Sequence, residues 1–212
     1  MNRTSHILIL VIIWLFCSSR TCTEDRNLSA IDEVNALAAA KDSIRQTFEV
    51  DQPDEDLLRA YEKTARQKLS DFADFLKIVS DTSLNIKFRE QAAEMVKRLF
   101  ENGDADIRNW AKVYSETEIS TLKELLSKSL SNGSAFWIQP EQIDVSEPLS
   151  ATNDSTYRGK LSFYQKCIPF DFRKPTPQIL QMKSINIHVI KKIKSFGDES
   201  LNVWEVYLGN FN

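Results

Sequence analysis

The hydrophobic pattern of this 212-residue chain changes its period part-way along. Over about residues 29–132, apolar side chains recur every three or four residues, which places them on one face of an α-helix. Over about residues 134–211, apolar and polar side chains alternate, the spacing of a β-strand with one buried face. Helices followed along the chain by strands are typical of an α+β fold. We therefore expect a single α+β domain at residues 24–212, with a helical part followed by an antiparallel sheet.

Two long helices are expected at the start of the helical part. The first runs from about Ile31 to Phe48. The second opens at Asp51–Asp54, where proline is well tolerated because the first helical turn offers no internal partner for the N–H that proline lacks. Its apolar residues keep a spacing of three or four from Leu57 to Val79. This is the clearest helical pattern in the chain.

Two more helices are expected before the strands. The third ends at Asn102-Gly103, because glycine readily adopts the left-handed conformation of a helix exit. A short extended piece at about Asp106–Trp110 leads to the fourth helix, whose stripe runs from Ile119 to Leu130. Ser115 and Glu118 match a capping box at its start. The third helix is expected to bury Phe88, Ala92, Met95, Val96, Leu99 and Phe100.

Four strands are expected in the sheet part. The first is interrupted by Pro140, which indicates a bulge or an edge position because proline has no N–H to donate. Gly197-Asp198 forms the hairpin turn, within Ser195–Ser200, between the last two strands. Ile185, Ile187 and Val189 share one face of the third strand, and Asn186 and His188 share the other. The strands are expected at Ala135–Ile138 with Gln142–Val145, Thr156–Cys167, Lys183–Lys194 and Asn202–Phe211.

Close to its start the chain carries an unbroken apolar run of ten residues, Ile7–Phe16. A membrane-spanning helix needs about 20 such residues. The shorter run, with Arg3 before it, fits the hydrophobic centre of a secretory signal. Cleavage is expected after Ser19 or Thr23. Residues 1–23 are therefore a predicted signal peptide, and the mature protein is expected to be periplasmic or secreted.

Lipid attachment is the alternative to release. Bacterial lipoproteins are acylated on the first mature cysteine, and Cys17 and Cys22 both lie in the right region, although neither follows the usual small apolar residues. Cys22 is the candidate lipidation site. If Cys22 survives processing unmodified, a disulfide with Cys167 is an alternative that spacing alone does not decide.

The charge of the chain argues against one class of partner. Removing Arg3 and Arg20 with the signal leaves 25 basic against 30 acidic residues, a net charge of −5. Electrostatic capture of nucleic acid needs a concentrated basic face, which this composition does not indicate. We expect no nucleic-acid partner, and membrane contact only through a lipid anchor.

The expected order of elements is three helices, a short strand, a fourth helix and four antiparallel strands. This order resembles the NTF2-like cone fold, and the resemblance implies a curved sheet that wraps the helices and leaves a pocket between them. A second resemblance lies in the closing part of the chain. Tyr157–Leu161, Gln165 and Val203–Gly209 look like a segment that recurs in uncharacterised exported Bacteroidetes proteins, and this resemblance implies no activity.

Few residues offer catalytic chemistry. Histidine is the usual general base and a common metal ligand, and His188 is the only histidine beyond the predicted signal. A lone histidine makes no two-histidine metal site. The sequence contains no GxSxG, HExxH, glycine-rich phosphate loop or EF-hand loop. We therefore expect no metal, no cofactor and no catalytic machinery belonging to a known template.

If the fold has a pocket, His188, Trp204, Tyr207 and Phe163 are the candidates to bind a ligand there. The alternative for the three aromatic side chains is packing in the core. The alternative for His188 is a hydrogen-bonded or solvated position on the more polar face of its strand.

Two charged groups also have alternative interpretations. Asp104 and Asp106 lie near Trp110 and could form a pair of carboxylates, but solvated charges at a helix end are the favoured explanation. The cluster Lys191-Lys192-Ile193-Lys194 could contact a phosphate or an acidic partner. Lysines that protect an exposed strand edge are the favoured explanation for this cluster.

These observations favour an exported binding or interaction module that recognises a small ligand or another envelope protein. Two alternatives remain. One is a small enzyme, a hydrolase or an isomerase, in which His188 works with an acid inside a cone pocket. The other is a structural accessory of an envelope complex.

The first prediction concerns processing. Protein isolated from its own host should have lost about 23 residues, because the apolar run is a signal rather than a membrane span. Intact-mass measurement would give the cleavage site, and an added lipid mass would assign the anchor. Recovery of the chain at its full translated mass would contradict the signal peptide.

Overall fold

The structure is a computed structural model that describes residues 50–111, 119–132, 136–169, 180–196 and 199–212, and a few earlier positions. The chain divides into two compact units, residues 1–49 and residues 50–212. Four residues of the first unit are described and all are helical, at positions inside the predicted first helix: Asn35, Ala36, Ala39 and Asp42. The predicted signal, Cys22, the Ser115 and Glu118 cap and the Gly197-Asp198 turn lie outside the described residues.

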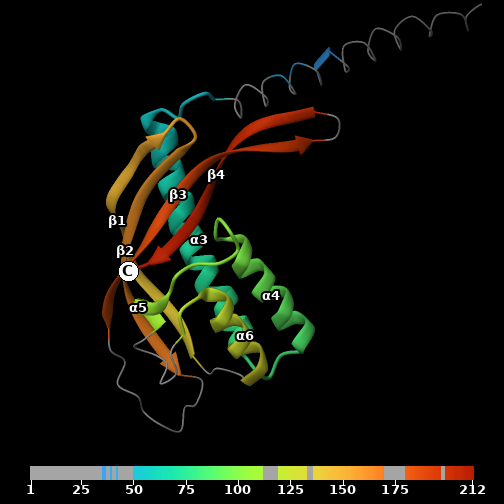
Figure 1. The fold of residues 1–212 in the computed structure, drawn as a ribbon, viewed down its shortest axis with the longest axis vertical. Coiled ribbons are helices and arrows are strands. Elements are labelled where there is room, and N and C mark those ends of the chain that lie inside the picture. The colour runs from blue at the N-terminus through green and yellow to red at the C-terminus, as the bar shows by residue number, and fades with distance from the viewer. Residues whose placement is uncertain are drawn as a thin grey trace, which may run out of the picture. The chain divides into compact units, whose positions relative to one another are not determined.

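The second unit is an α+β fold, as the sequence predicts (Figure 1). Its four strands are antiparallel and neighbour one another in chain order, β1-β2-β3-β4. The long helix α3 contacts both edge strands, β1 and β4, and the sheet is curved. The elements seen in the described ranges are α3 (Glu55–Ser80), α4 (Ile86–Arg98), α5 (Arg108–Ala111), α6 (Leu122–Asn132), β1 (Phe136–Asn153), β2 (Thr156–Pro169), β3 (Gln181–Phe196) and β4 (Glu199–Phe211).

The start of α3 confirms the predicted helix opening. Asp54 is the N-cap, and its side chain accepts a hydrogen bond of 2.8 Å from the backbone N–H of Leu57. Glu55 and Asp56 follow in the first turn, where negative charge favours the helix dipole. Much of the predicted apolar stripe is also buried, through Ala65, Leu69, Phe72, Leu76 and Val79, whereas its other members are half-buried: Leu57, Leu58, Tyr61 and Phe75.

Helix α4 buries only part of its predicted stripe. Ala92 and Val96 are buried, as expected, but Phe88 is 51% exposed and Met95 is 37% exposed. Both exposed side chains lie about a quarter turn away from the middle of the buried stripe on the helix. The residues of α4 that pack inward are Arg89, Ala92, Ala93 and Val96, and the prediction that Phe88 and Met95 belong to the core is wrong.

The segment after α4 also differs from the prediction. Helix α4 ends at Arg98, with Leu99 as its C-cap, so the predicted end at Asn102-Gly103 is too late; Gly103, with a φ of 67°, lies in the turn that follows. Asp106 forms a single β-bridge with Thr121. The extended piece predicted at Asp106–Trp110 does not continue beyond it, because Arg108–Ala111 form the short helix α5. The Asp106 side chain accepts the N–H of Arg108 at 2.9 Å and so favours a helical turn there.

Helix α6 begins later than predicted, at Leu122. Ile119 precedes it, and Thr121 pairs with Asp106 in an antiparallel bridge. Thr121 Oγ1 accepts the Glu124 N–H at 3.3 Å, and Glu124 Oε2 accepts the Thr121 N–H at 3.3 Å. This reciprocal pair is a capping box that lies six residues after the one predicted at Ser115 and Glu118.

Strand β1 is an edge strand with several irregularities, as Pro140 indicates. Its register shifts between Glu141 and Asp144, where Gln142 has a φ of 50°. The strand runs on to Asn153, well beyond its predicted end. On β2, a Cβ at Gly159 would lie 2.8 Å from the β1 backbone, so only glycine allows this close approach.

Strands β3 and β4 extend beyond the end of β2. The pairing of β2 with β3 ends at Thr156 and Ile190, whereas β3 and β4 stay paired as far as Phe196 and Glu199. We call residues 191–196 with 199–204 the β3–β4 arm (Figure 1). Because the ladder continues to Phe196, the predicted turn at Ser195–Ser200 is too long.

Four aromatic rings form the centre of the core. Phe72 lies 5.7 Å from Phe100, 6.1 Å from Trp110 and 5.5 Å from Phe211, measured between ring centroids. Trp110 is fully buried, and its indole Nε1 donates a 2.8 Å hydrogen bond to the side-chain oxygen of Gln165, which is also fully buried. The bond satisfies two polar groups that would otherwise be costly to bury.

Arg89 ties three helices together. Its side chain is almost completely buried on α4. Its Nε donates a 2.9 Å hydrogen bond to the carbonyl oxygen of Val79 in α3. One of its terminal nitrogens donates a 2.5 Å hydrogen bond to the carbonyl oxygen of Ser129 in α6. Both carbonyls lie in the last turns of their helices, where backbone acceptors lack intrahelical partners.

The second prediction follows from this buried guanidinium. Replacing Arg89 with Met should lower the free energy of unfolding by about 2–4 kcal/mol, because two buried carbonyls lose their donors. Urea unfolding followed by circular dichroism would measure it. Arg98→Met, an exposed site on the same helix, should change the free energy by about 0.5 kcal/mol or less. Equal effects of the two substitutions would show that Arg89 adds little to stability.

Candidate functional site

The register of β3 and β4 sorts the four predicted ligand-binding residues onto two faces. His188 pairs directly with Tyr207, so their side chains point to the same side of the sheet. Trp204 pairs with Lys191 and points to the opposite side. Phe163 lies on that opposite side as well, by its pairing with Lys183. The structure therefore brings His188 and Tyr207 together and separates them from Trp204 and Phe163.

His188 has a carboxylate partner that the sequence did not reveal. Its Nδ1 lies 3.0 Å from Oε2 of Glu101, and the two side chains are 17% and 37% exposed. Glu101 reaches this face because Phe100, just before it, forms a parallel bridge with Leu208 at the edge of β4. A Cβ at Gly209 would lie 3.1 Å from His188 Nε2, so glycine makes room for the ring.

A second set of polar contacts surrounds Tyr207 on the same face. The Tyr207 hydroxyl donates to Oε2 of Glu205 at 2.6 Å and accepts from Nζ of Lys192 at 3.0 Å. Nζ of Lys194 lies 3.1 Å from the other carboxylate oxygen of Glu205. We call these four residues, with Glu101 and His188, the β3–β4 network.

The surroundings of Tyr207 and Glu205 fix their protonation states. Partial burial and the hydrogen bond to Glu205 raise the pKa of Tyr207 far above its ordinary value. Partial burial would raise the pKa of Glu205, but hydrogen bonds from Tyr207 and Lys194 and the charge of Lys68 outweigh it and lower that pKa. Tyr207 therefore stays a neutral donor and Glu205 stays an anion near neutral pH.

Lys68 joins the network from helix α3. Its ammonium nitrogen lies 5.8 Å from the centroid of the Tyr207 ring. Partial burial lowers the pKa of Lys68, and the nearby charge of Glu205 offsets only part of this effect. The cation on Lys68 is thus less well stabilised than one in water.

Trp204 and Phe163 have other contacts. The Trp204 indole donates a 2.9 Å hydrogen bond to the carbonyl oxygen of Val50 and packs edge-on against Tyr157, with 5.4 Å between ring centroids. Phe163 is fully buried in the hydrophobic core. In this structure both side chains therefore contribute to packing.

The two predicted carboxylates after α4 act as local hydrogen-bond acceptors. Asp104 accepts the backbone N–H of Lys123 at 3.0 Å, and Asp106 accepts that of Arg108 at 2.9 Å. Each side chain satisfies a backbone donor at a turn or at the start of a helix. Their geometry is explained by the local fold.

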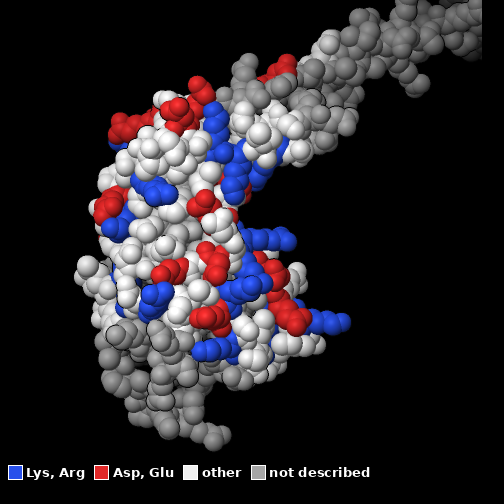
Figure 2. Space-filling model, viewed as in Figure 1, with Lys and Arg blue, Asp and Glu red and all other residues white. Residues whose placement is uncertain are grey.

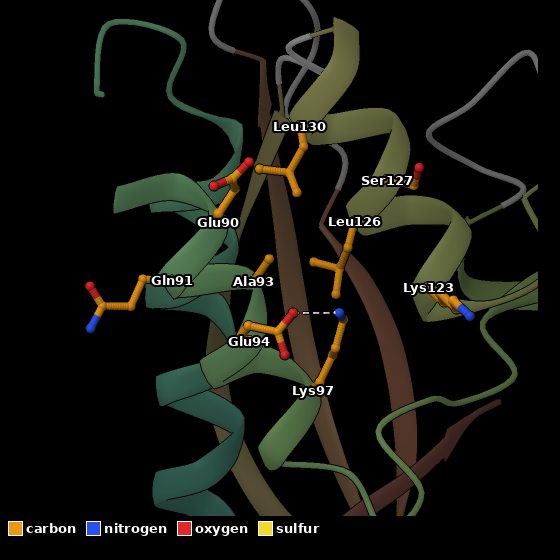
Figure 3. A pocket seen from close by; sticks show the side chains of 9 residues that line it. All are labelled: Glu90, Gln91, Ala93, Glu94, Lys97, Lys123, Leu126, Ser127 and Leu130. Carbon is orange, nitrogen blue, oxygen red and sulfur yellow. Dashed lines mark hydrogen bonds and ion pairs between the residues drawn. The ribbon is translucent and has the colours of Figure 1, made fainter. Parts of the chain in front are cut away.

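A groove of about 520 Å³ lies between α4 and α6 (Figure 3). Ala93, Leu126 and Leu130 supply its apolar surface. Lys97 pairs with Glu94 across one helical turn at 2.6 Å. The groove contains none of the four predicted ligand-binding residues. Its remaining lining residues are Glu90, Gln91, Lys123 and Ser127.

Comparisons with known proteins add no identity: no family model matches the chain, and neither the curated proteins nor the solved structures yield a match. Among the residues that the structure describes, no three His, Cys, Asp or Glu side chains are grouped so as to hold a metal ion. No helix in this same part of the chain is long and apolar enough to cross a membrane.

The third prediction tests the network through its central hydroxyl. Tyr207→Phe should raise the pKa of Glu205, because one hydrogen bond that stabilises the carboxylate is lost. Titration of the Glu205 carboxyl carbon by NMR would measure the shift. Tyr164→Phe, at an exposed residue of β2, should leave the titration unchanged.

The same substitution has a consequence for stability. A carboxyl group whose folded-state pKa is lowered stabilises the fold above its unfolded pKa, and this stabilisation is lost as the pH falls through the folded-state pKa. Tyr207→Phe should bring the folded-state pKa of Glu205 closer to its unfolded value. The protein should then lose less stability through protonation of Glu205 as the pH falls. An unchanged Glu205 titration would contradict this account of the network.

Proposed function

We propose that this chain is an exported, non-enzymatic binding or interaction module whose β3–β4 network recognises a small ligand or another envelope protein. The supporting observation is that His188 and Tyr207 are cross-strand neighbours, each bonded to a carboxylate, and that His188 and Glu101 are partly open to solvent beside the buried Tyr207. Polar side chains that are already fixed by hydrogen bonds to one another lose little further conformational entropy when a ligand binds. Such preorganisation favours recognition.

The proposal includes an NTF2-like architecture. Helices that precede a curved antiparallel sheet are compatible with a cone, and α3 contacts both edge strands, as a wrapped helix would. In such a cone the β3–β4 arm would extend one wall beyond the end of β2.

Export is the third part of the proposal and rests on the sequence. The apolar run Ile7–Phe16 supports a signal peptide and a periplasmic or secreted location. Cys22 would hold the mature chain at a membrane if it is acylated.

A small enzyme is the second candidate, favoured by one observation. His188 and Glu101 are 3.0 Å apart, and a carboxylate can orient a histidine so that its other nitrogen acts as a base. We place this candidate second because His188 Nε2 lies close over Gly209 and the ring does not line the α4–α6 groove. A catalytic base needs room for a substrate beside that nitrogen.

The fourth prediction tests recognition on this face. Protein purified from its own host and examined by native mass spectrometry should carry a ligand or partner. That added mass should be lost from Tyr207→Ala and from His188→Ala, and kept by Tyr164→Ala. Retention by all variants, with circular dichroism showing native folding, would place recognition elsewhere.

The same samples separate binding from catalysis. A binding module should release its ligand chemically unchanged after prolonged incubation. Conversion of the ligand by the wild-type protein, but not by His188→Gln, would favour the enzyme instead.

A further inference from the structure

Three lysines gather around Tyr207 and Glu205. Nζ of Lys192 lies 4.2 Å from the centroid of the Tyr207 ring, and that of Lys68 lies 5.8 Å from the same point. Nζ of Lys194 lies 3.1 Å from Glu205. The three side chains come from α3 and β3, which are far apart in sequence, so the cluster is a product of the fold.

Lysines outnumber the carboxylates that are bonded directly to this cluster. Glu205 is the one carboxylate bonded to the cluster in the described ranges, and it pairs with Lys194. Neither Lys68 nor Lys192 forms an ion pair with any residue that the structure describes. Two other acids act on the cluster through charge without bonding to it: Asp71 acts on Lys68, and Glu101, which lies against His188, acts on Tyr207. Lys68 and Lys192 are therefore two ammonium groups without a bonded carboxylate among the described residues.

Lys191 provides a contrast to Lys192. It is the sequence neighbour of Lys192 but points to the opposite side of the sheet, next to Trp204. There its Nζ lies 2.9 Å from a carboxylate oxygen of Asp51. The lysine on the other face is therefore neutralised within the protein.

We infer that Lys68, Lys192 and Lys194 bind a phosphate group, either free or as part of a lipid headgroup; this inference rests on the proposed recognition role of the same face. A phosphate monoester carries a charge of about −1.5 to −2 at neutral pH and could pair with the two lysines, Lys68 and Lys192, that have no ion pair among the described residues. Lysine binds phosphate as a point charge on a flexible stem, so several lysines can converge on one group.

Access and electrostatics agree with this assignment. Figure 2 shows Lys and Arg side chains on the arm, beside a hollow that separates it from the upper end of α4. Lys68 is partly buried and its pKa is lowered, so the cation would be stabilised by a second anion nearby. The Tyr207 hydroxyl stays protonated and helps to hold Lys192 in place.

Inorganic phosphate titrated into the purified full chain at low salt, and followed by calorimetry, tests the inference. We expect saturable binding that Lys192→Gln and Lys68→Gln each weaken roughly tenfold, because each removes one charge from the site. Lys191→Gln is the matched control and should bind as the wild type does. Acetate, a monoanion, should bind more weakly than phosphate.

Vesicles separate the two sources of phosphate. Retention on phosphatidylcholine vesicles that contain phosphatidic acid, but not on phosphatidylcholine alone, would assign the site to a lipid headgroup. Binding of free phosphate without vesicle retention would assign it to a free or small-molecule phosphate. Either result supports the inference.

Two outcomes would overturn the inference. One is the absence of saturable phosphate binding, and the other is an equal loss in Lys191→Gln and Lys192→Gln. If the copurifying ligand still depends on Tyr207 while phosphate does not bind, the recognition face stands and the phosphate assignment alone fails.

Discussion

The contact on which residues 50–212 depend is the meeting of aromatic rings from α3, α5 and β4. Phe72, Trp110 and Phe211 come from segments that are remote in sequence, and their ring centroids lie between 4.9 and 6.1 Å apart. Burying large rings removes much apolar surface from water. The hydrogen bond from Trp110 to Gln165 then anchors this centre to β2, so one cluster joins the helices to two strands of the sheet.

This core also explains how the candidate site is assembled. With Phe100 and Phe211 packed inward, the chain after α4 lies along β4, where the N–H of Leu208 donates to the carbonyl oxygen of Leu99 at 2.9 Å. Glu101, the next residue but one, then reaches over Gly209 to His188. The polar pair on one face of the sheet is thus positioned by apolar packing on the other face.

The two faces of the β3–β4 pair have different chemistry. One carries Val189, Val206 and Leu208, which belong to the core. The other carries His188 and Tyr207 with the acids and lysines around them. A strand alternates its side chains between faces, so the same short segments carry both the core residues and the polar network. The two lysines of the polar face that have no ion pair among the described residues, Lys68 and Lys192, are the feature that the core does not require.

The sequence alone determined the helix Glu55–Ser80, the antiparallel strands and the separation of His188 from the buried face of β3, because these depend on local spacing and local capping. Tertiary structure decided the rest. Phe88 and Met95 are exposed because α4 packs through the face that carries Arg89, Ala92 and Val96, and Glu101 meets His188 across 87 positions of sequence. Local patterns carry no information on such contacts, since they arise only when packing brings distant segments together.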